Sequence, residues 1–195
     1  MSKVLGIDVS SSTIGYCILD VNKQTGNIKF VQANYIKPPK KGHIVERIAA
    51  TRKEIEGVLL EFKPDYIGIE EIVQFMQGKS TAKTIIMLTT FNRMTGLVAY
   101  DYLHKAPEMF SVMTIRHGLK TSKVFPKKEE MPDLVAQHLG ITFPWLKTKS
   151  KITKKGKKIE SKIKVESYDM ADGVAVALYY AFVLTGRVQR KVKKK

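Results

Sequence analysis

The organisation of this chain is decided by the stretch Lys3-Val-Leu-Gly-Ile-Asp-Val-Ser-Ser-Ser-Thr-Ile-Gly-Tyr-Cys-Ile-Leu-Asp20. Its first half, Val4 to Val9, is a short apolar run that predicts a buried central strand. Its second half, from Ile14 to Val21, predicts another strand, and the serine turn between them indicates a β-hairpin. Asp8 lies inside the first run, where a buried carboxylate without a partner is strongly unfavourable. We therefore expect a cation, a hydrogen-bond donor or a metal beside Asp8.

The composition limits the class of protein. The chain has 195 residues, 44% of them hydrophobic, so a single domain with a substantial core is expected over residues 1–195. Lys and Arg total 34 against 18 Asp and Glu, and the net charge of +16 favours nucleic acid as partner over a membrane surface or a merely solubilising role. The single cysteine, Cys17, excludes a disulfide framework and a cysteine-based zinc site. No apolar run reaches membrane-spanning length and no signal peptide precedes the first strand, so a soluble, intracellular protein is expected.

Hydrophobic periodicity predicts alternating helices and strands after the hairpin. The predicted elements are, in order, a strand at Ile28–Ile36, a helix at Ile44–Phe62, a strand at Tyr66–Glu70, a helix from a cap at Ser80 or Thr81 to about Leu103, a strand at Met109–Ile115, a helix at Lys127–Leu139 and a helix from about Asp169 to about Thr185. This order predicts an α/β fold whose mixed five-stranded sheet combines an antiparallel meander with parallel strands and carries helices on both faces.

A lysine-rich segment at about 146–166 separates the last two predicted helices. It contains nine lysines against Glu160 and Glu166, and it predicts either a basic β-hairpin that turns at Gly156 or a disordered loop. A basic tail follows at 187–195. Such charge suits contacts with phosphate. The lysines of the segment that we assign to DNA binding are Lys151, Lys154, Lys155, Lys157 and Lys158.

Four carboxylates stand out by their positions. Besides Asp8 they include Glu70, at the end of the fourth strand, where functional groups gather in an open α/β sheet. Asp169 and Asp172 open the last helix at a spacing that puts both on one face. Each has an ordinary structural explanation: Asp169 could be an N-cap, Asp172 a first-turn acid, and Glu70 a surface residue. Together they predict a divalent-metal site, because carboxylate oxygens are the ligands that Mg²⁺ and Mn²⁺ prefer.

A metal site of this kind has a clear use in a cationic protein. Lysines would hold the phosphate backbone while the acids hold two ions, which activate a water and stabilise the departing oxygen. The metal charge would also offset the repulsion among the acids. Glu71 competes with Glu70 for this role. Neighbours in a strand point to opposite faces, and Glu70 shares its face with Gly68 rather than with an apolar residue, so we prefer Glu70.

Three motifs resemble, in order and in rough spacing, those of the RuvC Holliday-junction resolvases, a branch of the RNase H-like nucleases. They are Gly-Ile-Asp8 followed by Gly15-Tyr16, Pro64-Asp-Tyr-Ile-Gly-Ile-Glu70, and Asp169-Met-Ala-Asp172-Gly-Val-Ala-Val-Ala. The resemblance implies an RNase H-like fold and a homodimeric endonuclease that resolves four-way DNA junctions by paired symmetric nicks. It also implies two Mg²⁺ ions per active site, with Mn²⁺ able to substitute, and no membrane partner or small-molecule substrate. The metal ligands would be Asp8, Glu70, Asp169 and Asp172.

The resemblance extends to positions outside the acids. Phe75 matches a phenylalanine that packs against junction bases, with a role as a core anchor as the alternative, and Lys79 in the same loop is assigned to DNA contact. Lys120 and one of Lys127 or Lys128 fall near the places of the family's catalytic lysines.

A predicted interface and two departures complete the resemblance. The helix around Ile85–Leu103 is apolar around most of its circumference, which is typical of deep burial or a subunit interface, and it matches the family's dimer interface. Val9-Ser10 stands where bacterial members commonly have Pro-Gly, and the insertion at 147–164 is unusual for them. These departures favour a divergent member from a virus, a phage or an organelle.

Three alternatives to a resolvase stay open from the sequence. One is another RNase H-like nuclease that cuts RNA–DNA hybrids, flaps or forks. Another is a sugar-kinase or actin-like ATPase, whose first phosphate loop the opening stretch resembles, although the chain is short and lacks the second such loop. The third is a non-catalytic junction-binding protein, which leaves Asp8 unexplained.

Overall fold

The computed structural model describes residues 1–72, 81–152, 158–159 and 161–188 of the chain. Within these ranges five strands form one sheet in the order β3-β2-β1-β4-β5. The strands are β1 (Ser2–Val9), β2 (Ile14–Val21), β3 (Ile28–Ile36), β4 (Tyr66–Glu71) and β5 (Glu108–Ser111). The first three form an antiparallel meander, whereas β4 runs parallel to β1 and β5 parallel to β4. The predicted mixed five-stranded α/β sheet is confirmed.

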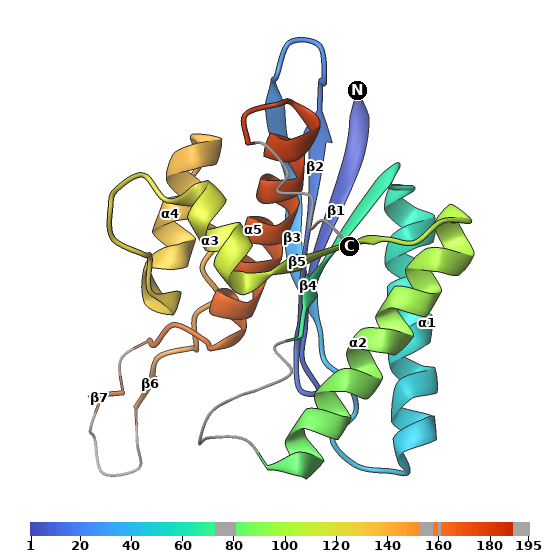
Figure 1. Cartoon of the computed structure of the whole chain (residues 1–195). Coiled ribbons are helices and arrows are strands. Elements are labelled where there is room, and N and C mark those ends of the chain that lie inside the picture. Colours follow the sequence, from blue (N-terminus) through green and yellow to red (C-terminus); the bar gives the residue numbers. More distant parts are fainter. Residues whose placement is uncertain (73–80, 153–157, 160, 189–195) are drawn as a thin grey trace.

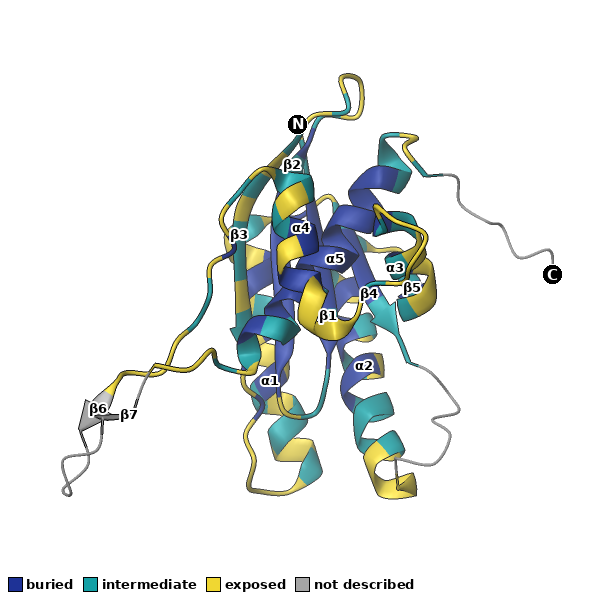
Figure 2. Ribbon diagram, turned by 90° about the vertical axis from the view of Figure 1, so that its left-hand side faces the viewer, coloured by how far each residue is buried: buried dark blue, intermediate teal, exposed yellow. Residues whose placement is uncertain are grey.

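Helices cover both faces of the sheet (Figure 1). One face carries α1 (Ile44–Phe62) and α2 (Ala82–Leu103). The other carries α5 (Glu166–Leu184), with α3 (Val112–Leu119) and α4 (Met131–Leu139) beside it. Each face has its own hydrophobic core, and Figure 2 shows α5 as a largely buried helix. None of the helices in the described ranges combines the length and apolarity needed to cross a bilayer.

Side chains on β1 alternate between the two cores. Leu5 and Ile7 lie in the core on the side of α1 and α2, whereas Val4 lies in the core on the side of α5. Because neighbours in a strand point to opposite faces, Asp8 shares the face of Val4 and points toward α5. The hydrophobic pattern of the first strand thereby decides which helix the acid meets.

Glycines allow the backbone of α5 to lie directly on β1 and β2. A Cβ atom on Gly15 would lie 1.8 Å from the carbonyl oxygen of Asp169, and one on Gly6 would lie 2.1 Å from the amide nitrogen of Ala177. On the helix, a Cβ atom on Gly173 would lie 2.7 Å from the carbonyl carbon of Gly15. No side chain fits between helix and sheet at these points, so their distance and relative position are narrowly determined.

Capping side chains begin α1 and α2 where the sequence predicts. His43 Nδ1 accepts a hydrogen bond from the Val45 amide, and the Glu46 carboxylate accepts one from the His43 amide. The Thr81 hydroxyl oxygen accepts from the Thr84 amide at 3.3 Å and caps α2. β2, β3 and α1 begin and end at the predicted residues.

The predicted boundaries around α3 and at the start of α5 are wrong. The strand predicted at Met109–Ile115 ends at Ser111, and the residues that follow form α3. Its β-branched and apolar residues are typical of a strand, but the Ser111 hydroxyl accepts from the Thr114 amide and caps a helix. The last helix begins at Glu166, three residues earlier than predicted, so Asp169 is not its N-cap.

The segment before α4 differs from the predicted helix, and the segment after α4 contains two short strands. The helix predicted from Lys127 starts as a 3₁₀ turn at Lys128–Glu130 before α4 begins. After α4, the lysine-rich segment contains two short strands, β6 (Lys151–Ile152) and β7 (Lys158–Ile159), which pair in antiparallel orientation. The predicted turn at Gly156 lies outside the described residues.

Gly15→Ala should destabilise the protein, because the added methyl group would collide with the backbone of α5 at Asp169. We expect the free energy of unfolding, measured by urea denaturation, to fall by about 3 kcal/mol. Gly96→Ala in α2 is the matched control, because a Cβ atom there would meet nothing within 4 Å. The control should be as stable as the wild type or slightly more stable. Equal stability of Gly15→Ala and the wild type would contradict this packing.

Candidate metal centre

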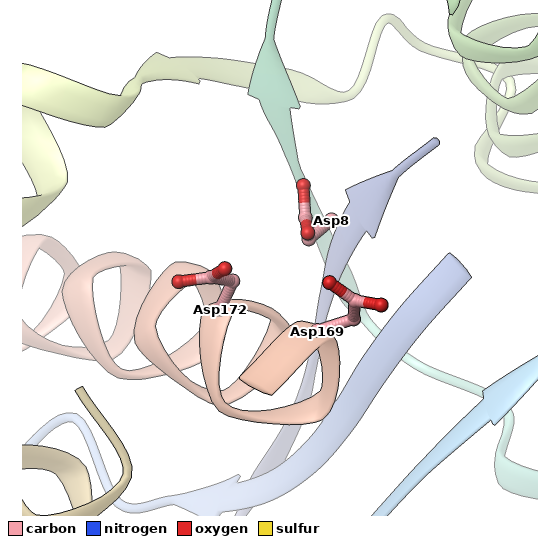
Figure 3. A group of neighbouring side chains, drawn as sticks. All are labelled: Asp8, Asp169 and Asp172. Carbon is pink, nitrogen blue, oxygen red and sulfur yellow. The ribbon is translucent and has the colours of Figure 1, made fainter. Parts of the chain in front are cut away.

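Three carboxylates from β1 and α5 converge at one point. Asp8, Asp169 and Asp172 each offer a carboxylate oxygen, and these three oxygens lie within 4.8 Å of one another. Figure 3 shows Asp8 on β1 facing the start of α5, which carries the other two acids. All three residues are partly buried. The close contact of α5 with the sheet at its glycines is what brings acids from opposite ends of the chain together.

Glu70, the fourth predicted acid, lies near the end of β4 on the same face of the sheet. The tripeptide Gly-Ile-acid occurs in both β1 and β4, and the two copies are paired with Gly6 opposite Gly68. Continuing this parallel register places Glu70 beside Asp8. Glu70 lies outside the group of three close oxygens, but its charge acts on Asp8.

Burial and mutual repulsion disfavour the charged forms of these acids. Burial raises the pKa of Asp8 well above its ordinary value, and the charges of Glu70 and Asp172 raise it further. Burial, followed by the charge of Asp172, raises the pKa of Glu70 to about 7. The pKa of Asp172 is also raised, chiefly by burial. The neighbouring cations therefore do not fully offset the burial of these acids and the repulsion among them.

Two cations partly neutralise the acids. The Lys128 ammonium lies 3.1 Å from Asp169 Oδ1 and 3.3 Å from Asp172 Oδ2. Burial lowers the pKa of Lys128, but the charge of Asp172 and the hydrogen bond to Asp169 outweigh burial, so this pKa lies above its ordinary value. The Arg116 guanidinium on α3 lowers the pKa of Glu70 and of Asp172. The four carboxylates still outnumber these two cations.

The donor set fits a hard divalent cation. Mg²⁺ and Mn²⁺ prefer carboxylate oxygens, and three such oxygens lie close enough together to share an ion. A divalent cation would lower the raised pKa values and remove the repulsion among the acids. Asp8, Asp169 and Asp172 are the residues that could hold it, with Glu70 beside them.

Glu70 is held in place from the other face of the sheet. The Asn92 side chain on α2 is buried, and its Nδ2 donates to the main-chain carbonyl of Glu70 at 2.9 Å. Asn92 Oδ1 has no hydrogen-bond partner among the described residues. The end of β4 is thereby tied to α2, so the position of the acid depends on that helix as well.

The lysines predicted for the site do not all reach it. Lys128 contacts the acids, as described above. The Lys120 ammonium instead lies over the ring of Phe125, 5.5 Å from its centroid, and no ion pair joins Lys120 to an acid in the described ranges. Lys127 donates its main-chain amide to the Glu130 carboxylate at 2.7 Å.

Most residues predicted to contact DNA fall on parts of the chain whose side chains are not described. Those outside the described residues are Phe75, Lys79, Lys154, Lys155 and Lys157. For Lys151 and Lys158 the backbone belongs to β6 and β7. Their contact with DNA stays a prediction.

Arg116 and Asn92 are absent from the residues predicted from sequence. Arg116 follows a run that predicts a strand but lies on α3, and the cap at Ser111 is the signal that identifies this helix. Asn92 lies among the apolar residues of α2. A polar residue in the middle of a buried helix indicates a hydrogen-bond partner, although not which one.

Comparison with known proteins identifies one family. Residues 4–112 match the family model of crossover junction endodeoxyribonuclease RuvC. The protein of that name from Syntrophomonas wolfei is 28% identical over 92 residues, which cover 45% of this chain and 52% of that protein. The one from Fusobacterium nucleatum is 26% identical over 145 residues, covering 72% of this chain and 70% of that protein. The chain thus spans about half the length of the first relative.

Solved structures share the fold. Thermus thermophilus RuvC in complex with a Holliday junction substrate has a TM-score of 0.66 at 17% identity, with 94% of each chain covered. The yeast mitochondrial Holliday junction resolvase has a TM-score of 0.60 at 15% identity, covering 94% of this chain and 79% of that one. At these identities the likeness establishes the fold.

Asp8→Asn should stabilise the protein when divalent metal is absent. Folded wild-type protein holds the Asp8 proton more tightly than the unfolded chain does, because the folded-state pKa is raised. The free energy of unfolding of the wild type therefore falls as the pH rises through that pKa, whereas asparagine cannot ionise. Urea denaturation in EDTA from about pH 5 to about pH 8 should show an advantage for Asp8→Asn that grows to about 1–3 kcal/mol.

Glu71→Gln is the control for this experiment. Glu71 follows Glu70 on β4 and points to the opposite face of the sheet, so its replacement leaves the cluster of Asp8, Asp169 and Asp172 intact. If Asp8→Asn were less stable than the wild type at the upper end of this range, Lys128 would be a sufficient partner for the ionised Asp8.

Proposed function

This chain belongs to the crossover junction endodeoxyribonuclease RuvC family, and from this we infer that it is an endonuclease that resolves four-way DNA junctions by paired symmetric nicks. The convergence of Asp8, Asp169 and Asp172 within 4.8 Å is the observation that carries the proposal. The matched residues 4–112 include Asp8 and Glu70. The acids of α5 lie outside that region, and the fold brings them to the same place.

Branched DNA is the substrate that we infer. A protein of the same fold has been solved with a Holliday junction substrate, and the net charge of +16 supports extensive phosphate contact. A four-way junction has approximate two-fold symmetry, so a symmetric dimer with two sites can nick two opposing strands.

We propose that each active site binds two Mg²⁺ ions, with Mn²⁺ able to substitute. Asp8, Asp169 and Asp172 would hold them, with Glu70 as a further ligand. Such ions would supply Lewis-acid stabilisation of the scissile phosphate and would favour deprotonation of the attacking water. The raised pKa values of Asp8 and Glu70 support this assignment, because carboxylates crowded into a part-buried site need cations.

Lys128 and Arg116 have separate roles in the proposed reaction. The Lys128 side chain is 46% exposed, so its ammonium can contact a phosphate while it stays beside Asp169. Its raised pKa keeps it charged at neutral pH, so it neutralises charge rather than taking up a proton. Arg116 opposes protonation of Glu70 and keeps that carboxylate available as a ligand.

α2 has a second apolar face, which we infer to be the dimer interface. Phe91 and Val98 pack into the core, whereas Ile86, Leu97 and Tyr100 are 64%, 55% and 51% exposed. The helical repeat places these three exposed residues on one side of α2, together with the exposed Arg93. A helix that is apolar on two sides is typical of one that packs on its own sheet and on a partner.

Cleavage of a synthetic mobile four-way junction in Mg²⁺ tests the proposed activity. The wild type should make paired, symmetrically placed nicks. Asp8→Asn should lower the cleavage rate by about three orders of magnitude or more, because it removes a charged ligand, while binding to the junction is retained. An RNA–DNA hybrid and a linear duplex are tested in parallel as alternative substrates.

Other outcomes of this assay would change the conclusion. Cleavage of the hybrid instead of the junction would assign the protein to RNase H-type function. Tight junction binding without cleavage in Mg²⁺ or Mn²⁺ would leave a junction-binding protein, and the acids would lose the role proposed here.

Leu97→Glu tests the dimer interface. A charge in the centre of the exposed face should give a folded monomer by light scattering and circular dichroism, and paired nicking should be lost with the dimer. Leu60→Glu on α1 is the control, because Leu60 is equally apolar and 69% exposed but lies on another helix. A Leu97→Glu protein that stays dimeric would exclude this face as the interface.

A further inference from the structure

A two-stranded basic arm extends from the base of α5; it consists of residues 146–152, 158–159 and 161–164. Lys147 pairs with Ile163 near its base, and Lys151 pairs with Ile159 in β6 and β7. Both strands advance by four residues between these two pairs, so the two pairs share one register. Figure 1 shows the arm projecting away from the sheet and its covering helices.

The base of the arm is attached to the helix that carries two of the acids. The Leu146 amide donates to the hydroxyl of Ser167, a fully buried residue, at 3.0 Å. The Trp145 ring packs edge-on against Tyr168, with ring centroids 5.9 Å apart. Ser167 and Tyr168 directly precede Asp169 in α5. The base of the arm is therefore held in a defined position relative to the acid cluster.

The arm presents lysines without acidic partners. Lys147, Lys149 and Lys162 are exposed, and none of them forms an ion pair within the described ranges. A solubilising surface usually mixes both signs of charge, whereas residues 146–166 contain nine lysines and two glutamates. Unopposed charge on a projecting element indicates a polyanionic partner.

We propose that the arm binds the phosphate backbone of a DNA duplex that leaves the junction, and so contributes to affinity while the acids carry out cleavage. This inference rests on the proposed function. Duplex DNA carries about one negative charge per 1.7 Å of helix axis, which matches a closely spaced set of lysines. Residues 146–166 contain no arginine, asparagine or glutamine, so the arm lacks the planar side chains that bind base edges bidentately, and its lysine ammonium groups are point charges suited to phosphates.

Composition also distinguishes duplex from single-stranded DNA as the partner. Proteins that bind single strands combine positive charge with aromatic side chains on which bases stack. Residues 146–166 contain no aromatic side chain, so the arm offers no stacking surface. The arm is therefore suited to the backbone of double-stranded DNA.

A triple variant with Lys147→Gln, Lys149→Gln and Lys162→Gln tests the arm. Junction affinity is measured over a range of salt concentrations. The slope of log affinity against log salt should become shallower by about 0.9 for each lost phosphate contact, up to about 2.7 for all three. The single-turnover cleavage rate at saturating protein should be unchanged, because these lysines contact none of the acids.

The control changes the same amount of charge elsewhere. Lys29→Gln, Lys63→Gln and Lys105→Gln alter exposed lysines at the end of the sheet where β3, β4 and β5 begin, opposite the acids. Their triple variant should leave the salt slope nearly unchanged. An unchanged slope in the arm variant, or an equal change in both variants, would overturn the proposal.

Binding to a linear duplex and to a single strand distinguishes a failure of the arm proposal from a failure of the proposed function. The arm variant should weaken binding to a linear duplex with the same loss of slope and weaken binding to a single strand less. Weakened binding to the single strand alone would contradict the assignment to duplex DNA. A wild-type protein that cuts no junction would refute the proposed function, whereas the arm is judged by binding alone.

Discussion

The direct contact between the backbone of α5 and the backbones of β1 and β2 is the constraint on which the rest of the structure depends. It exists because Gly6 and Gly15 on the sheet meet Gly173 on the helix with no side chain between them. A hydrophobic interface of larger side chains would allow several positions, but backbone atoms in contact allow few. The carboxylates of Asp169 and Asp172 are therefore placed beside Asp8 by packing, before any ligand is considered.

This packing has an electrostatic cost. It brings together carboxylates whose pKa values burial and mutual repulsion raise, and Glu70, with a pKa of about 7, is among them. Lys128 and Arg116 reduce the cost without removing it. Asn92 prevents the simplest relief, because its hydrogen bond holds the end of β4 and resists a shift of Glu70 away from the other acids. The fold thus maintains a site that is more favourable with a cation than without one.

Features set by local sequence could be predicted, and those set by packing could not. The bounds of β2, β3 and α1 follow from periodicity and turn residues, both of which are local. The sequence could predict that the four acids lie together, because the ends of strands and helices meet predictably in this topology. For α3 the local signals conflict: its β-branched residues favour a strand, whereas Ser111 is a typical N-cap. The packing of Ile115 and Leu119 into the core supports the helix. No periodic signal distinguishes Lys128, which turns inward, from Lys120, which lies over an aromatic ring.

The excess positive charge and the cluster of acids lie in different parts of this protein, and they act on DNA over different distances. The net charge of +16 attracts DNA over about a Debye length, roughly 10 Å at 0.1 M salt. The acids act at contact distance, where a phosphate meets four carboxylates and, among the described residues, the two cations Lys128 and Arg116. The last step in the approach of a phosphate to the acids is therefore repulsive until a divalent cation is bound. Affinity and cleavage then depend on different groups, so a strongly cationic nuclease can bind DNA widely and still cut only where a phosphate reaches the start of α5 with that cation present.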